Sequence, residues 1–198
     1  MEAEWENNLM ELTLYKSTGT YIMKVADEIQ QMLDDHLVLT QQISFSPFKG
    51  AFSERIDEWE EKLRVTSEVI EEWMDVQKQW MYLEPIFTSE DINRQLPAES
   101  KKYNTMERTW RRIMRNAFDC PMILITCPDR KLLESLRDCN HLLEVVEKGL
   151  TDYLETKRSV FPRLFFLSDD ELLEILSQAR NPLAVQPHLR KCFENIAR

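Results

Sequence analysis

The stretch "ERIDEWEEKLRVTSEVIEEWMDVQKQWMYLE", residues 54–84, decides the fold. Mostly apolar residues recur in it at alternating steps of three and four, which is the spacing of one face of an α-helix. This face consists of Ile56, Trp59, Leu63, Thr66, Ile70, Trp73, Gln77 and Trp80. Ser53 is a suitable N-cap and Pro85 a suitable stop. We therefore predict one long helix, which has to bury this face against another helix.

A second long helix with the same spacing is predicted from Asp129 to about Ser159. Its apolar face consists of Leu132, Leu136, Cys139, Leu143, Val146, Leu150 and Tyr153. A further helix, which carries Tyr103, starts near Pro97. We expect the two long helices to pack together at coiled-coil-like angles. The tryptophans are expected in the core, because indole rings fill wide gaps between helices. The predicted seam of the bundle consists of Trp59, Trp73, Trp80 and Trp110.

Towards the N-terminus the pattern changes. Alternating residues on both sides of the turn at residues 17–20 predict a β-hairpin at residues 12–23. Helical spacing returns from Ala26 and stops before Pro47, since the residue before a proline is pushed away from helical angles. We expect the hairpin and this helix to form an N-terminal subdomain, residues 1–50, and the long helices to form a second, residues 51–198.

Near the C-terminus, "VFPRLFFL" contains a proline that does not fit inside a helix. We expect Val160–Leu167 to be extended, with its apolar side chains buried on at least one face. Ser168 and Glu171 fit a capping box that starts a helix running to about Gln178. Pro187 fits the first turn of a last helix.

The predicted fold class is therefore mainly all-α. It is an elongated antiparallel helical bundle with one small hairpin at residues 12–23 and a short extended segment at 160–167. Only 3 glycines in 198 residues argue against folds built on tight turns. A net charge of -10 argues against nucleic acid as a partner. No apolar run approaches the length of a membrane span, so no membrane partner is expected, and the acidic N-terminus is not a signal peptide.

The sequence contains no P-loop, no GxSxG and no HExxH motif. The 4 cysteines lack CxxC pairing, which favours free thiols in a reducing compartment. His36 with Asp34 and Asp35 is a conceivable metal site, and a cysteine with His141 or His188 is a conceivable nucleophile. A helix surface or a core histidine is the favoured interpretation. We expect no catalytic, metal-binding or cofactor-binding residues, and hence no cofactor.

Charge is distributed unevenly along the chain. Residues 54–75 contain nine acidic and three basic residues, whereas residues 101–115 contain six basic residues and one acidic residue. Solvated helix faces are the favoured interpretation of both segments. Docking of the basic face on an acidic protein surface is the second interpretation, and nucleic-acid binding aided by Tyr103 and Trp110 is the third. These patterns alone describe an acidic helical scaffold.

Longer strings carry a resemblance to a known family. They are "LDDHLVLTQQISFSPF" (33–48), "WMDVQKQWMYLEPIF" (73–87), "DINRQLPAES" (91–100), "TWRRIM" (109–114), "KGLTDYLETKRSVFPRLFFLSDDELLEIL" (148–176) and "VQPHLRKCFENI" (185–196). In this order, over nearly the whole chain, they resemble the linker region of dynein heavy chains. "YLEPIF" and "VQPHLRKCFE" are more similar to axonemal than to cytoplasmic members. Leu164 stands where the family usually has phenylalanine, which is a conservative apolar change.

The resemblance implies a helical, rod-like linker that arches over the AAA+ ring of the same heavy chain. ATP turnover in the ring bends and straightens the linker, and this swing drives movement toward the microtubule minus end. The ATP sites lie in the ring, so this region is expected not to be an enzyme, although the full heavy chain is expected to be an ATP-driven motor. Implied partners are the AAA+ ring, other dynein subunits and, only through the full-length motor, microtubules. The implied location is the cytoplasm and cytoskeleton, in the axoneme of a cilium.

Four residues are our candidates for docking on the side of the linker that faces the ring: Phe161, Arg163, Phe165 and Phe166. We expect them to tie the second long helix to the final helices, with Arg163 opposite the apolar face. The alternative function is a non-motor helical scaffold or tethering module that binds protein partners. A spectrin-like module would need an internal repeat, and the two halves of the chain do not align by their prolines or tryptophans.

Overall fold

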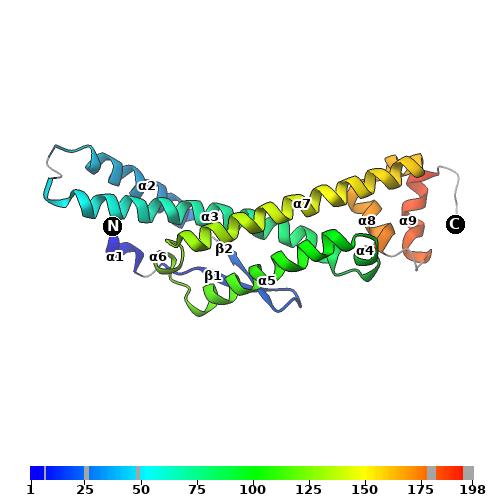
Figure 1. Cartoon of the computed structure of the whole chain (residues 1–198), viewed down its shortest axis with the longest axis horizontal. Helices are drawn as coiled ribbons and strands as arrows, with labels where there is room; N and C mark the ends of the chain where they lie inside the picture. The colour runs from blue at the N-terminus through cyan, green and yellow to red at the C-terminus, as the bar shows by residue number, and fades with distance from the viewer. Residues whose placement is uncertain (7, 25–26, 48–49, 178–181, 194–198) are drawn as a thin grey trace. The chain divides into compact units, whose positions relative to one another are not determined.

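The structure, a computed structural model, describes residues 1–6, 8–24, 27–47, 50–177 and 182–193. In this part of the chain it is mainly helical, with one two-stranded antiparallel sheet, as predicted (Figure 1). The first half contains α1 (Glu2–Trp5), β1 (Glu11–Tyr15), β2 (Thr20–Lys24), α2 (Asp27–Ser44), the 3₁₀ helix η1 (Gly50–Phe52) and α3 (Ser53–Phe87). The second half contains α4 (Glu90–Gln95), α5 (Pro97–Asp119), α6 (Ile123–Thr126), α7 (Arg130–Val160), the 3₁₀ helix η2 (Pro162–Phe166), α8 (Asp169–Ser177) and α9 (Pro182–Cys192).

Two compact units divide the chain. Unit 1 contains Met1–Lys78 and Glu107–Asn140, and unit 2 contains Gln79–Met106 and His141–Arg198. The helices α3, α5 and α7 contribute residues to both units. The subdomain boundary that we expected at residue 50 stays a prediction.

The hairpin of unit 1 is attached to α3 by a buried glutamine. Its two strands are antiparallel, with Leu12 opposite Met23. Gly19 lies in the turn at a φ of 70°, a left-handed value that favours glycine. The side-chain oxygen of Gln77 accepts a hydrogen bond from the Met23 N–H (2.7 Å), and its amide nitrogen donates to the Met23 carbonyl (2.8 Å). A side chain of α3 therefore satisfies backbone groups on the free edge of β2.

The core of unit 1 is built around two tryptophans from α3 and α5. Trp73 and Trp110 are both fully buried, with their rings edge to face and their centroids 6.5 Å apart. The Trp73 indole N–H points to the sulfur of Met114 on α5 (3.2 Å). Buried side chains that complete this core include Leu33, Leu63, Val69, Val76, Leu136 and Cys127. The predicted apolar faces of the two long helices are therefore largely buried in this unit, except near the start of each helix, where Ile56, Trp59 and Leu132 are half-buried.

In unit 2, α5 and α7 approach each other closely. A Cβ on Gly149 of α7 would lie 2.7 Å from Cγ of Glu99 on α5, so any larger residue here would displace the Glu99 side chain. Phe87 of α3 and Tyr103 of α5 stack with their ring centroids 4.9 Å apart. The fully buried side chains of this unit include Trp80, Leu83, Ile92, Met106, Leu143 and Leu154.

Two prolines do not end or start helices where we predicted. Pro85 lies inside the last turn of α3, which continues to Phe87. The turn is completed by the Thr88 N–H, which donates to the Glu84 carbonyl (3.0 Å), so only one helical hydrogen bond is lost at the proline. Pro187 lies inside α9, because that helix starts five residues earlier at Pro182. The predicted helix ends at Gln178 and Ile196, and the predicted helix start at Ala26, lie outside the described residues.

The prediction that Val160–Leu167 is extended was wrong. α7 continues through Val160, and Pro162–Phe166 form a 3₁₀ helix. The Leu164 N–H donates to the Phe161 carbonyl (3.0 Å), and the Leu167 N–H donates to the Leu164 carbonyl (3.1 Å). Proline at the first position fits this helix, because its fixed φ is compatible with a 3₁₀ turn and its missing N–H is not needed there.

Candidate functional site

The end of α7 and the helix η2 carry an exposed apolar surface. We call it the phenylalanine surface and define it as Val160, Phe161, Phe165 and Phe166, whose side chains are 81%, 43%, 65% and 70% exposed. The expected burial on one face holds for Leu167, which is 3% exposed, and in part for the half-buried Leu164, whereas the four residues of the phenylalanine surface are exposed. In a 3₁₀ helix residues three apart share a face, so the face that contains Leu167 is buried while Phe165 and Phe166 point away from it.

Arg163 fastens η2 to α9. Its guanidinium donates a hydrogen bond to the carbonyl of Cys192 (2.9 Å) and lies 4.6 Å from the ring centroid of Phe193. Phe161 also contacts this ring, with the two centroids 6.1 Å apart. Arg163 thus satisfies a carbonyl in the last turn of α9 and stacks on an aromatic ring. Arg163 and Phe161 therefore contact the same ring at the end of α9, so Arg163 does not lie opposite Phe161. The docking role of these residues stays a prediction.

The start of α8 is held next to the end of α7. Arg158 of α7 donates to the Leu167 carbonyl (3.0 Å) and pairs with Asp169 (2.6 Å). Ser168 and Glu171 form the predicted capping box, in which each side chain binds the backbone N–H of the other. Hydrogen bonds from Lys191 of α9 and from the Ser168 N–H hold the pKa of the Glu171 carboxyl below its ordinary value. The phenylalanine surface therefore stands on a locally fixed backbone.

The four tryptophans of the predicted seam do not share one environment. Trp73 and Trp110 are buried in unit 1, and Trp80 is buried in unit 2. Trp59, near the start of α3, is only half-buried and lines two surface hollows of unit 1. The helical period places the three tryptophans of α3 on one face, but it does not indicate where the helices that cover this face end.

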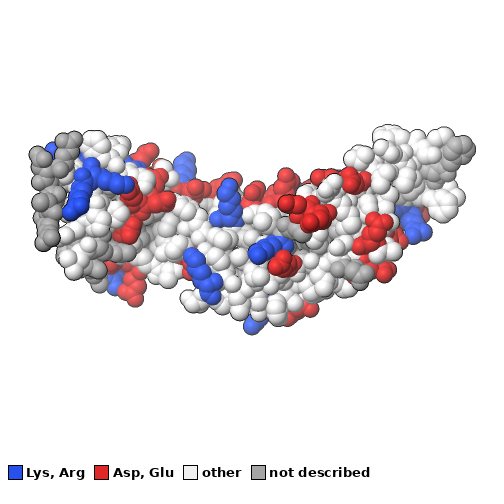
Figure 2. All heavy atoms as spheres, turned by 180° about the vertical axis from the view of Figure 1, so that it is seen from behind, with Lys and Arg blue, Asp and Glu red and all other residues white. Residues whose placement is uncertain are grey.

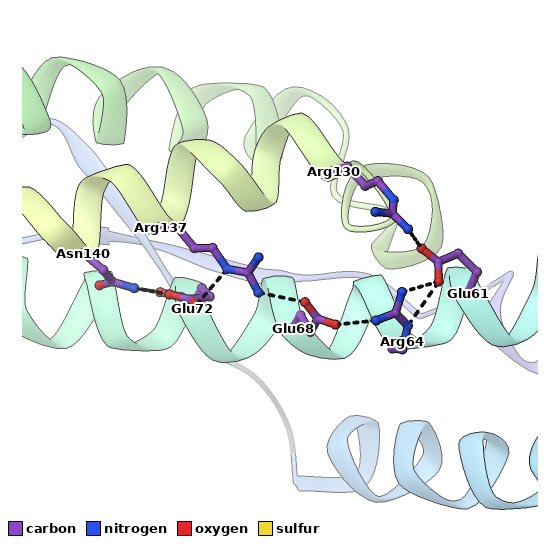
Figure 3. A network of polar contacts seen from close by, with 7 residues as sticks. All are labelled: Glu61, Arg64, Glu68, Glu72, Arg130, Arg137 and Asn140. Atoms are coloured by element: carbon purple, nitrogen blue, oxygen red, sulfur yellow. Dashed lines mark hydrogen bonds and ion pairs between the residues drawn. The ribbon is translucent and has the colours of Figure 1, made fainter.

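A network of ion pairs joins α3 and α7 in unit 1 (Figure 3). Arg137 of α7 binds Glu68 (2.8 Å) and Glu72 (3.3 Å) of α3. Arg130, one heptad earlier on α7, pairs with Glu61, one heptad earlier on α3. Because both sets of partners advance in the same direction along the chain, the two helices run parallel here.

The same network contains links within α3 and a neutral partner. Arg64 binds Glu61 (2.5 Å) and Glu68 (3.2 Å), and Asn140 donates to the backbone carbonyl of Glu72 (3.2 Å). The Arg64 and Arg130 guanidiniums hold the pKa of the Glu61 carboxyl below its ordinary value. These side chains are partly exposed, so each pair contributes little alone, but the network fixes the register of two helices.

Sequence reasoning assigned these acidic residues to a solvated face and missed the network. A usable signal was present: Glu61 and Glu68 are seven residues apart, and so are Arg130 and Arg137. Matching heptad spacing of opposite charges indicates two neighbouring helices joined by ion pairs, but it does not indicate whether they run parallel or antiparallel. On the face drawn in Figure 2, acidic and basic side chains are interspersed, as such pairing produces.

His36 and two of the cysteines lie in the core. Both ring nitrogens of the buried His36 are engaged, by the Trp5 indole N–H (2.9 Å) and by Glu4 (3.1 Å). Burial raises the pKa of the Cys127 thiol to about 12 and that of Cys139 to about 11, which opposes thiolate formation. No group of three or more potential metal ligands is found among the described residues. Within the same residues, no helix is long and apolar enough to cross a membrane.

Comparisons with known proteins point to one family. The whole chain, residues 1–198, matches the family described as "Dynein heavy chain, N-terminal region 2". It is 63% identical to mouse (Mus musculus) dynein axonemal heavy chain 1 and 62% identical to the human (Homo sapiens) protein, over 100% of this chain and 5% of each relative. It is 50% identical to human dynein axonemal heavy chain 12, over 100% of this chain and 6% of that relative. The chain thus spans about a twentieth of the length of the curated relatives it matches.

Proposed function

The chain belongs to the dynein heavy chain family, in which it is a stretch of N-terminal region 2, and from this premise we propose that it is part of the linker lever of an axonemal motor. The lever bends and straightens over the AAA+ ring of the same heavy chain. This motion produces minus-end-directed movement on microtubules in a cilium. Other dynein subunits and, through the complete motor, microtubules are the further partners in this proposal.

One observation carries the mechanical part of the proposal: long helices run side by side with fully buried tryptophans between them. A lever transmits force only if it deforms less than the object it moves. Close-packed interiors are stiff, because every side chain is held by its neighbours. Trp73 and Trp110 supply such packing in unit 1, and Trp80 supplies it in unit 2. The parallel ion-pair network adds resistance to sliding of α3 along α7.

The phenylalanine surface supports the docking part of the proposal. Apolar side chains that are exposed on a fixed backbone mark sites of protein contact. We propose that Phe161, Phe165 and Phe166 contact the ring side of the motor, while Arg163 holds the surface in place through α9. The local fixation by Arg158 and the capping box fits a site that has to transmit force rather than only bind.

A softened lever tests the proposal in the full-length heavy chain. Trp80→Ala removes a fully buried side chain, and truncations of this kind lower the unfolding free energy by about 3–5 kcal/mol. We expect the microtubule-stimulated ATPase rate to stay within about twofold while gliding speed falls severalfold, because the ring still turns over ATP but strain is absorbed in the lever. Leu83→Ala is a milder variant in case the first does not fold.

Lys78→Ala is the matched control, since Lys78 is an exposed residue on the same helix. This variant should leave the ATPase rate and the gliding speed unchanged. A normal gliding speed in Trp80→Ala and Leu83→Ala motors of reduced stability would contradict the lever. A parallel fall of ATPase rate and speed would also contradict it, because the region would then act on catalysis rather than on force transmission.

A further inference from the structure

A second exposed apolar surface lies in unit 1, and the lever proposal does not use it. The phenylalanine surface, by contrast, belongs to unit 2. A hollow of about 630 Å³ lies between α1, the first turns of α3 and α6. We call it the Trp59 hollow and define it by its apolar lining of Trp5, Trp59, Met122, Leu124 and Ile125. Ile125 is 64% exposed and Met122 is 36% exposed, so apolar side chains at this hollow are in contact with water. Such a combination is typical of an interaction site.

The walls of the hollow are held by backbone contacts. The Met10 N–H donates to the carbonyl of Pro121 (2.7 Å), and Leu9 forms an isolated antiparallel bridge with Met122. Within the lining itself, Arg55 of α3 pairs with Glu2 of α1 (3.0 Å). The hollow therefore exists before any partner arrives, which lowers the entropy that binding has to offset.

The uncompensated charge at the hollow is negative. Glu6 and Glu58 line it, and both are exposed. Neither carboxylate has an ion-pair partner within the residues the structure describes, and together with the paired Glu2 and Arg55 and with Lys62 they give the lining a net charge of -1. The one cation of the lining that is not ion-paired among those residues, Lys62, lies 6.0 Å from the tryptophan ring centroid. Such an arrangement attracts a basic partner and repels an acidic one.

We propose that the Trp59 hollow binds a basic amphipathic helix of another protein. The apolar face of such a helix covers Trp59 and Ile125, and its Lys and Arg side chains meet the carboxylates of Glu6 and Glu58. An anionic membrane and a nucleic acid are disfavoured, because the same carboxylates repel phosphate groups. A second copy of this surface is disfavoured as well, since it would bring an equally acidic rim.

The test uses the full-length heavy chain and a fluorescein-labelled peptide. The peptide is a helix of roughly five turns, made of leucine on one face and lysine on the other, with one photo-crosslinking residue among the leucines. We expect saturable binding by fluorescence anisotropy, with crosslinks that map to residues 122–125 and to the start of α3. A peptide with glutamate in place of lysine, and one with serine in place of leucine, should each bind at least about tenfold more weakly.

Variants of the heavy chain locate the binding. Ile125→Asp should weaken the lysine–leucine peptide about tenfold or more, because it places a charge on the apolar lining. Glu58→Lys should weaken this peptide and strengthen the glutamate–leucine peptide. Both side chains are exposed, so neither change threatens folding. Leu14→Asp is the matched control, since Leu14 is 62% exposed on β1, away from the hollow lining, and should bind as the unmodified chain does.

Three results would overturn the proposal. The first is equal binding to the Ile125→Asp and unmodified heavy chains. The second is equal binding of the lysine–serine and lysine–leucine peptides, which would reduce the effect to charge alone. The third is self-association in sedimentation that Ile125→Asp abolishes, because the occupant would then be a second copy. The lever test above has a different readout, so the two proposals can fail independently.

Discussion

At the scale of single residues, the buried side chains of His36 and Gln77 form hydrogen bonds to specific partners on other elements. His36 is the clearest case, because its Nδ1 accepts a hydrogen bond from the Trp5 indole and its Nε2 therefore carries the proton that faces Glu4. A residue that the sequence presents as a metal candidate is thus used to hold α1 against α2. Gln77 serves in the same way between the hairpin and α3. Neither role could be predicted, since both depend on contacts between segments far apart in sequence.

The buried thiols predict how stability depends on pH. The folded pKa values of Cys127 and Cys139, about 12 and about 11, lie above the ordinary thiol value of 9.0. Below pH 9 the folded and the unfolded chain both keep the thiol protons, so the contribution of the two buried thiols to stability is fully present. As pH rises from about 9 toward the folded pKa values, only the unfolded chain releases them. Stability therefore falls, by up to about 1.4 kcal/mol per pH unit for each thiol.

Urea unfolding between pH 8 and pH 11 measures this effect. The Cys127→Ala, Cys139→Ala double variant should be less stable at neutral pH, because it leaves cavities, but its stability should fall less steeply above pH 9. Cys120→Ala, at a half-buried position, serves as the control. Parallel curves for the double variant and the unmodified chain would show that the thiols do not carry the pH dependence.

At the scale of elements, Gly149 of α7 leaves space that the Glu99 side chain of α5 occupies in unit 2. Gly149 lies inside α7, where glycine normally weakens a helix by about 0.8–1 kcal/mol relative to alanine. Alanine would not recover this helix stability at position 149, because its Cβ would lie only 2.7 Å from Cγ of Glu99. Helix propensity and helix packing therefore oppose each other at this residue, and packing prevails.

Gly149→Ala should consequently give little or no stabilisation in the unmodified chain. In a Glu99→Ala background the obstruction is absent, and the same substitution should raise the unfolding free energy by about 1 kcal/mol. Urea unfolding of the four members of this double-mutant cycle measures the coupling. An identical effect of Gly149→Ala in both backgrounds would show that the two helices do not constrain each other here.

At the scale of the whole molecule, the region has to be judged as part of a heavy chain. Its relatives are about twenty times longer, so surfaces that are exposed in this stretch are available to other parts of the same protein. The phenylalanine surface and the Trp59 hollow belong to different units, and they are of different chemistry. The first is apolar beside a fixed arginine, whereas the second combines apolar residues with free carboxylates. We expect them to serve different partners.

The docking proposal predicts a selective defect in the complete motor. Phe165→Asp with Phe166→Asp should change the stability of this region by less than about 0.5 kcal/mol for each exposed position. Gliding speed should nevertheless fall severalfold, because the charged pair disrupts an apolar contact with the ring. Chemical unfolding and a gliding assay provide the two measurements. Phe45→Asp is the control, since Phe45 is 88% exposed at the end of α2 in the other unit. The docking role is refuted if both variants glide at the normal speed or are slowed equally.

The sequence by itself determined the helices, the hairpin and the family. Apolar periodicity, the hairpin alternation and the capping box of Ser168 and Glu171 are local properties, so they can be recognised without a partner segment. The 3₁₀ helix at Pro162–Phe166 and the exposure of its phenylalanines were decided by tertiary structure, because an apolar string does not specify which of its faces will be covered. The parallel ion pairs, the close approach at Gly149 and the acidic Trp59 hollow were decided in the same way. Each of them depends on which helices become neighbours, and that depends on how the buried faces of all the helices fit together.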